Sequence, residues 1–175
     1  MPPISADEAE AMWRGPCQRG RARNLGITSV RTETGLARVW SAGDGISVPV
    51  AVACSTAAPG VAPPVAVAGS VWVDAGVRSI VNADLIVEMP VADGAAARHA
   101  RPGKVLILVP LPGPNVAREE AILVEHGYEV RVITANRFYT KPADLLDVDF
   151  IDVAAAAGAG QARDLAASLA SWLGD

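Results

Sequence analysis

The sequence predicts an α/β fold in which a mostly parallel sheet, flanked by helices, follows an antiparallel β-meander. Between residues 27 and 56, short β-rich runs are joined by glycine-bearing turns, which is typical of hairpins. Between residues 104 and 135, a buried strand, a helix and a second buried strand follow one another, which is typical of a parallel crossover. We therefore expect residues 65–175 to be Rossmann-like or flavodoxin-like, and the 175 residues to form a single domain.

The composition argues against two classes of function, general nucleic-acid binding and metal binding. The formal charge of −4 and the pI near 5.2 argue against general nucleic-acid binding, which needs clustered Lys and Arg. The alternating Arg19, Arg21 and Arg23 could contact a phosphate or an RNA, but a solvated arm explains them as well. Two cysteines allow one disulfide at most and have no structural-zinc spacing, so we predict no metal site.

The amino-terminal residues 5–13 (SADEAEAMW) predict a short helix that starts at a serine cap and stops at Gly15-Pro16. Their acidic side chains stand where a secretory signal needs basic and apolar residues. Together with the expected reduced cysteines, this predicts a soluble cytoplasmic protein.

Residues 48–73 carry no charged side chain and are the candidate for a membrane span. Four prolines argue against this, because each removes a helical hydrogen bond that lipid cannot replace. Two buried strands, 46–55 and 65–73, separated by a Pro-rich connector, fit better, and we predict no membrane association.

The remaining elements follow in order. Runs 27–32, 36–42 and 46–55 predict the three strands of the meander (the meander portion is 27–56). Further strands are expected at 83–91, 104–111, 128–135 and 149–157, with a short helix or loop at 93–100 and helices at 115–127 and 158–175.

Both long helices carry recognisable signals. Asn115 can cap the first helix and Gly127 can close it. The last helix has a core-facing stripe at helical spacing, made of Ala162, Leu165, Ala166, Leu169, Trp172 and Leu173.

The candidate site lies where parallel strands end and helices begin, because backbone N–H groups and helix dipoles converge there. Loops 54–56, 110–115 and 157–161 meet this description if their strands share one direction. They predict a small anionic or phosphorylated ligand held by Ser55, Thr56, Gly113, Asn115, Gly158 and Gly160. The last loop lacks the third glycine of a dinucleotide fingerprint, since Arg163 stands there, so no cofactor is identified.

Cys54 is the catalytic candidate. The segment VACSTAA resembles the one that carries the first catalytic cysteine of the aspartate and glutamate racemases, which implies a thiolate that abstracts a substrate proton. The resemblance covers seven residues, and the second cysteine of that family has no counterpart, because Cys17 lies in GPCQRG. The alternative is a small apolar residue buried at a strand end.

A second resemblance concerns the fold. ADLIVEMPV followed by RPGKVLILVPL is similar to strand pairs of nicotinamide-dependent dehydrogenases such as alanine dehydrogenase. It implies two buried strands joined by a loop.

Three functions follow as hypotheses. The first is a small-molecule-binding domain with the anionic ligand described above. The second is a non-catalytic assembly or accessory subunit, homo-oligomeric or bound to a protein partner, because the apolar, weakly charged stretch 46–73 needs a cover. The third is a cysteine-dependent racemase, isomerase or lyase that uses Cys54.

Overall fold

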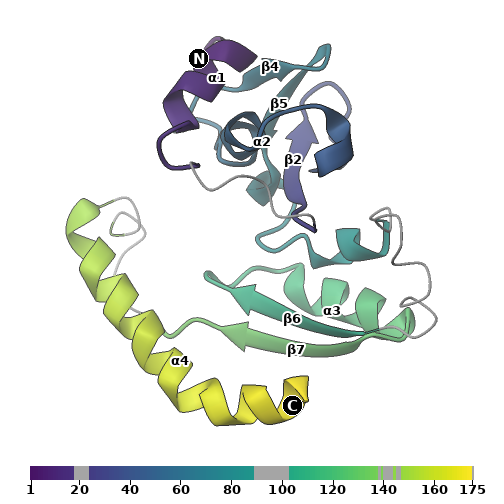
Figure 1. Cartoon of the computed structure of the whole chain (residues 1–175), viewed down its shortest axis with the longest axis vertical. Helices are drawn as coiled ribbons and strands as arrows, with labels where there is room; N and C mark the ends of the chain where they lie inside the picture. The colour runs from purple at the N-terminus through teal and green to yellow at the C-terminus, as the bar shows by residue number, and fades with distance from the viewer. Residues whose placement is uncertain (18–23, 89–102, 138, 140–143, 145–146, 175) are drawn as a thin grey trace.

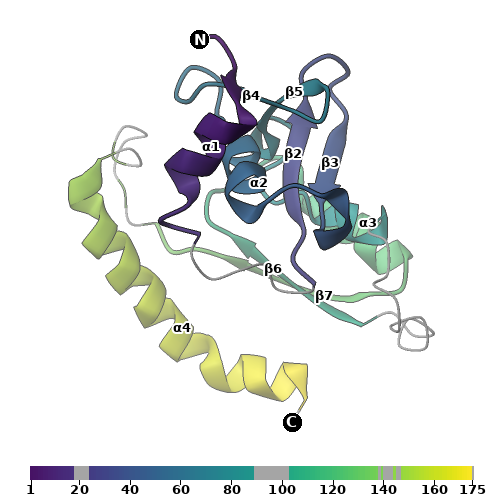
Figure 2. The same cartoon turned by 45° about the horizontal axis from the view of Figure 1, so that its top comes forward.

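The computed structural model describes residues 1–17, 24–88, 103–137, 139, 144 and 147–174. The amino-terminal residues build a five-stranded sheet with two helices on one face, and β6, β7 and α3 form a second, smaller layer (Figure 1). A long terminal helix, α4, runs along the outside of the smaller layer (Figure 2).

The larger sheet has the strand order β1-β4-β5-β2-β3. The β1–β4 pair is parallel and the other three pairs are antiparallel. Its strands are β1 (Ile4–Ser5), β2 (Ile27–Arg31), β3 (Ala37–Trp40), β4 (Val65–Val67) and β5 (Ser70–Asp74).

The predicted fold class is therefore wrong. The protein has a mixed, mostly antiparallel five-stranded sheet and a separate two-stranded parallel sheet instead of one mostly parallel, Rossmann-like sheet. The hairpin of β2 and β3 is confirmed, as is the parallel pair formed by β6 (Lys104–Val109) and β7 (Glu129–Thr134) around α3 (Val116–Glu125).

The third strand of the meander, predicted at 46–55, is a helix, α2 (Val48–Ser55). The Ser47 side chain accepts a hydrogen bond from the Val50 N–H at 3.3 Å, and Pro49 lies in the first turn, where proline is tolerated. A short, continuous apolar run fits a buried strand and a buried helix equally well, because it has no periodicity. Here the Ser47 cap favours the helix.

The run at 65–73, predicted as one strand, is a hairpin. Its turn is made by Ala68 and Gly69, both with positive φ (52° and 72°), and it joins β4 to β5. Two positive φ values match the right-handed twist of the flanking strands, so Ala68 adopts the left-handed conformation.

The core of the larger layer lies between the sheet and helices α1 (Ala6–Trp13) and α2. Trp40 and Trp72 meet edge to face, with ring centroids 4.7 Å apart. The predicted serine cap of α1 is confirmed, and it forms a capping box, since Ser5 and Glu8 bond each other's backbone N–H.

The smaller layer has its own core. Val105, Ile107 and Val109 of β6 pack with Leu123 of α3 and with residues of η3 (Ala83–Glu88). The strand predicted at 83–91 is this 3₁₀ segment as far as residue 88, and residues 89–91 and the helix or loop predicted at 93–100 lie outside the described residues.

The strand predicted at 149–157 is also a helix. A 3₁₀ turn, η5 (Val148–Phe150), leads directly into α4 (Ile151–Leu173), so strand and helix are one element. Alanine is the strongest helix former, and four successive alanines (154–157) propagate the helix through Gly158 and Gly160. None of its described side chains is buried, so the predicted core-facing stripe is at most half-buried.

Candidate functional site

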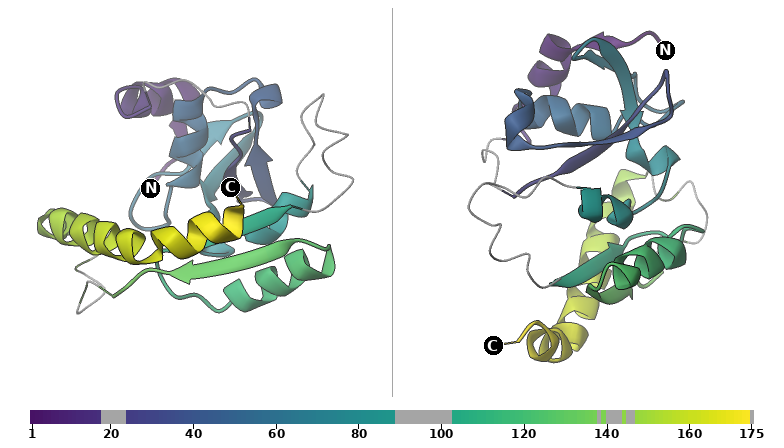
Figure 3. Two further views of the ribbon diagram at one scale, coloured as in Figure 1. Left: turned by 60° about the horizontal axis from the view of Figure 1, so that its bottom comes forward. Right: turned by 90° about the vertical axis from the view of Figure 1, so that its right-hand side faces the viewer.

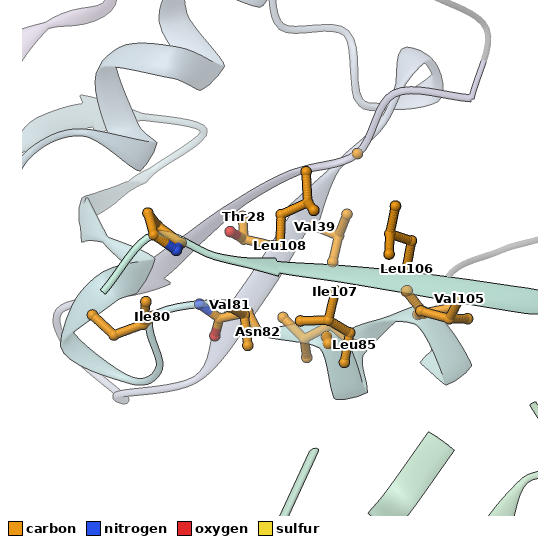
Figure 4. A pocket seen from close by; sticks show the side chains of 14 residues that line it. Thr28, Val39, Ile80, Val81, Asn82, Leu85, Val105, Leu106, Ile107 and Leu108 are labelled. Carbon is orange, nitrogen blue, oxygen red and sulfur yellow. The ribbon is translucent and has the colours of Figure 1, made fainter. Parts of the chain in front are cut away.

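The candidate site is a groove of about 410 Å³ between the two layers (Figure 4). Among the described residues, Thr28 and Asn82 are the polar residues of its lining, and none of the described lining residues is charged. The lining residues are Gly26, Thr28, Val39, Ile80, Val81, Asn82, Ala83, Leu85, Ile86, Val105, Leu106, Ile107, Leu108 and Pro110.

The groove follows the free edge of β6. Successive side chains of a strand point to opposite faces of the sheet. Four consecutive residues of β6, 105–108, all line the groove, so it runs along the edge of the strand and not over one face. Among the described residues, β7 is the one strand that pairs with β6.

The backbone of β6 has hydrogen-bonding groups on this open side. The carbonyls of Gly103 and Val109 accept the N–H groups of Glu129 and Ala135, so the odd-numbered residues of β6 face β7. The N–H and C=O groups of Leu106 and Leu108 consequently point into the groove. Leu108 is also 63% exposed, which is high for a strand residue in a continuous apolar run.

The opposite wall belongs to the larger sheet. Thr28 and Val39 are cross-strand partners on β2 and β3, and both face the groove. Their neighbours Ser29 and Trp40 point the other way, into the core, where the Trp40 indole donates to Ser29 Oγ at 2.7 Å.

The third wall is the loop 79–83, which a polar cluster holds against α3. The guanidinium of Arg78 donates to both carboxylate oxygens of Asp84, at 2.9 and 2.5 Å, and to Asn82 Oδ1 at 3.0 Å. Glu119, fully buried on α3, accepts from the Ala83 N–H at 2.6 Å, and its second oxygen lies 4.0 Å from the guanidinium. Hydrogen bonding from Arg78 holds the pKa of Asp84 below its usual range.

The same cluster keeps the polar end of Asn82 out of the groove. Its amide donates to the carbonyls of Ala75 and Ser79, at 3.1 and 2.6 Å, and its φ of 50° lies in the left-handed region. Such a conformation costs about 1 kcal/mol or more, which these buried hydrogen bonds offset. The groove is therefore apolar, and a phosphate would find no cation in its lining.

Two of the predicted ligand residues lie beside the groove. The Asn115 amide donates to the Arg78 carbonyl at 2.7 Å and does not cap α3, although Asn115 occupies the cap position. A Cβ on Gly113 would lie 2.9 Å from a side-chain carbon of Ile80, so this glycine permits the close packing of two loops.

The other predicted ligand residues lie elsewhere. Ser55 and Thr56 are at the end of α2, where the Thr56 hydroxyl donates to the Val52 carbonyl at 2.8 Å. Gly158 is exposed and Gly160 is half-buried, both within α4, which lies apart from α2 (Figures 1 and 2). The common rim does not form, because two of the three strands that were to end there are helices.

Cys54 is completely buried in α2, within the core of the larger layer. Burial raises the pKa of its thiol to about 12. A nucleophilic cysteine needs the opposite, an accessible thiol with a lowered pKa. The geometry therefore favours the structural role for Cys54.

Cys54 provides the first testable prediction. In the native protein, we expect iodoacetamide to label Cys54 at least about tenfold more slowly than a model thiol at neutral pH. Its pKa is raised in the folded state, so its contribution to stability is complete below the unfolded pKa, near 8.5. That contribution is lost as pH rises from about 9 to about 12, by up to about 1.4 kcal/mol per pH unit. Urea denaturation of wild type and Cys54→Ala across this range measures it, and native labelling as fast as a model thiol would contradict it.

Sequence reasoning missed the polar cluster and the groove. Arg78, Asp84 and Glu119 come from three different segments, and no sequence spacing links them. The one available signal was β6 itself, because the run VLILVPL is typical of a strand whose two faces are both covered.

The described part of the chain shows neither a membrane-spanning helix nor a metal-ligand cluster. None of its helices has the length and apolar character that a membrane crossing requires. Within the same residues, no three His, Cys, Asp or Glu side chains gather as metal ligands would.

The chain was also compared with known proteins. No protein-family model and no curated protein matches it.

Proposed function

We propose that this protein is a binding module that takes up an extended, apolar segment of another polypeptide along β6. This corresponds to the hypothesis of an assembly or accessory subunit. The observation that carries it is the open edge of β6, with the backbone groups of Leu106 and Leu108 directed into an uncharged groove. Strand addition of this kind uses backbone hydrogen bonds for affinity and side-chain pockets for specificity.

The chemistry of the groove describes the segment. Apolar side chains face the edge from both sides, Val39 and Leu108 on one and Ile80 and Ile107 on the other. A strand that lies between them is buried on both faces, so it should be a continuous Val- or Ile-rich run without charges. β6 has 6 residues, and a matching segment extends over about 20 Å.

The direction of the segment follows from the existing pair. Parallel strands occur mostly in sheets whose faces are covered, and a sheet of only two parallel strands leaves much of its surface open. A third strand parallel to β6 would make β6 a central strand, in agreement with its sequence. A second copy of this chain is a poor occupant, because its own β6 is recessed between the same walls.

A labelled peptide tests the proposal. The probe is a fluorescent Val/Thr peptide of about eight residues, mostly Val so that both of its faces are apolar, with lysines at one end for solubility. A control peptide with N-methyl groups at alternate residues keeps the side chains but loses the hydrogen bonds. We expect fluorescence anisotropy to show saturable binding of the first peptide only.

Matched variants locate the site. Leu108→Lys should weaken binding by roughly tenfold or more, because it puts a charge into the groove. Val124→Lys is the control, since Val124 is also exposed (54%) but lies on α3 outside the groove. If neither peptide binds, or if both variants bind alike, the proposal is wrong. Binding of a small apolar fluorophore without the peptide would favour the small-molecule hypothesis, and a stable wild-type dimer in light scattering would favour self-association.

A further inference from the structure

The outer edge of β7 is the second edge of the small sheet. Unlike the edge of β6, it is hydrogen-bonded by a side chain of α4. The Ala135 N–H donates to the Val109 carbonyl, so residue 135 faces β6 and its neighbours Thr134 and Asn136 face outward. These outward groups would be the next place for a strand to add.

Gln161 of α4 occupies that place. Its amide nitrogen donates to the Thr134 carbonyl at 2.7 Å, and its amide oxygen accepts from the Asn136 N–H at 2.9 Å. One carbonyl and one N–H, two residues apart on the same side of a strand, are what a neighbouring parallel strand engages with the N–H and C=O of one residue. The side chain of Gln161 thus takes the position of a third strand.

The rest of α4 follows β7 toward its beginning. Arg131 donates to the Ser168 carbonyl at 2.9 Å, and the Trp172 indole donates to Glu129 at 2.5 Å. The guanidinium of Arg131 also lies 5.3 Å from the centre of the Trp172 ring. In the left view of Figure 3, this half of α4 runs alongside β7.

We infer that Gln161 is a specificity-determining residue that closes the outer edge of β7, so that strand addition is confined to β6. The second part of this inference rests on the proposed function, while the closure of β7 does not. The contacts that hold α4 here are polar, and none of its described side chains is buried. Loss of the Gln161 amide should therefore open the edge without destroying a core.

The test compares Gln161→Leu with Ser168→Ala. Leucine keeps the size and helix propensity of residue 161 but cannot bond the strand. Ser168→Ala is the control, because the Ser168 backbone carbonyl, and not its hydroxyl, binds Arg131. Circular dichroism verifies that both variants retain their helices.

Two measurements decide the outcome. In Gln161→Leu, the Asn136 amide should exchange with deuterium about tenfold faster, and light scattering should show dimers that form with increasing concentration. Wild type and Ser168→Ala should show neither change. An unchanged exchange rate would show that Gln161 does not hold the Asn136 N–H. Faster exchange without dimers would show that Gln161 does not prevent strand addition at β7.

The peptide probe separates this inference from the proposed function. With the Val/Thr peptide, wild type should bind one molecule per chain and Gln161→Leu two, with the affinity at β6 unchanged. If wild type binds no peptide, the proposed function fails, but exchange and association still decide the role of Gln161. If wild type binds two peptides, Gln161 does not close the edge.

Discussion

Replacing Trp72 by alanine is expected to destabilise the protein by about 3–5 kcal/mol, a large part of the stability of a small domain. Trp72 lies at the centre of the larger layer, 2% exposed, against the ring of Trp40. Its indole also donates to the Val67 carbonyl at 3.0 Å, across the β4–β5 hairpin. Alanine removes this hydrogen bond and leaves a cavity, in a core whose other buried residues are Ala, Val, Cys54 and Trp40 and cannot collapse to fill the space.

Urea denaturation followed by circular dichroism measures this effect. Trp72→Phe should cost less than alanine, because it restores most of the volume but not the hydrogen bond. An exposed substitution, Val124→Ala, should change stability by no more than about 0.5 kcal/mol. A Trp72→Ala protein within about 1 kcal/mol of wild type would show that this layer does not depend on the tryptophan pair.

The second large effect is expected at the polar cluster. Arg78→Met should destabilise the protein by about 3 kcal/mol or more, because it leaves the carboxylates of Asp84 and Glu119 buried without their cation. Asp84 is 7% exposed and Glu119 is completely buried, so water cannot replace the guanidinium. The loop that forms one wall of the groove should loosen as well, with a loss of peptide binding.

The pH dependence of this variant has a defined sign. In wild type, Arg78 lowers the pKa of Asp84, so the stability from this pair is present above about pH 4 and is lost as pH falls further. In Arg78→Met, acid instead neutralises an unpaired carboxylate. The difference in unfolding free energy between the two proteins should therefore shrink from pH 7 toward pH 3.

An exposed ion pair provides the matched control. Arg38 pairs with Asp44 on the surface, and its side chain is 42% exposed. Arg38→Met should cost at most about 1 kcal/mol, since exposed pairs contribute little. Equal effects of the two Arg→Met substitutions, or an Arg78→Met effect that does not change with pH, would contradict the assigned role of the cluster.

The secondary-structure elements that carry a clear local sequence signal were predicted correctly. The β2–β3 hairpin, the β6–α3–β7 unit and the capped helix α1 are each marked by turn glycines, by periodicity or by a capping serine, and each is confirmed. Three segments predicted as strands are helical in the structure, namely 46–55, 83–91 (as far as residue 88) and 149–157, and each contains an apolar run: VPVAVAC, LIV and VAAAA. Such runs satisfy a buried strand and a helix equally well.

The candidate site was less predictable than the fold. The prediction correctly placed Asn115 at the start of a helix next to the end of β6, but it assigned the side chain to a ligand, and in the structure it binds the Arg78 carbonyl. Gly158 and Gly160 were predicted at a strand end, which required a strand that does not exist. The errors in secondary structure thus removed the common rim on which the predicted site depended, because a strand-end site is defined by where strands stop.

The sequence by itself determined that β6 is a continuous apolar strand, that it pairs in parallel with β7 across a helix, and that the proline-containing stretch 48–73 is not one continuous helix. Only the tertiary structure decided that, among the described residues, β6 has one open edge, that the larger sheet forms a wall beside it, and that Gln161 closes the other edge of the small sheet. The physical reason is that the hydrophobic pattern of a strand records which of its faces are buried. The neighbours that complete its backbone hydrogen bonds depend on how distant segments are placed in space.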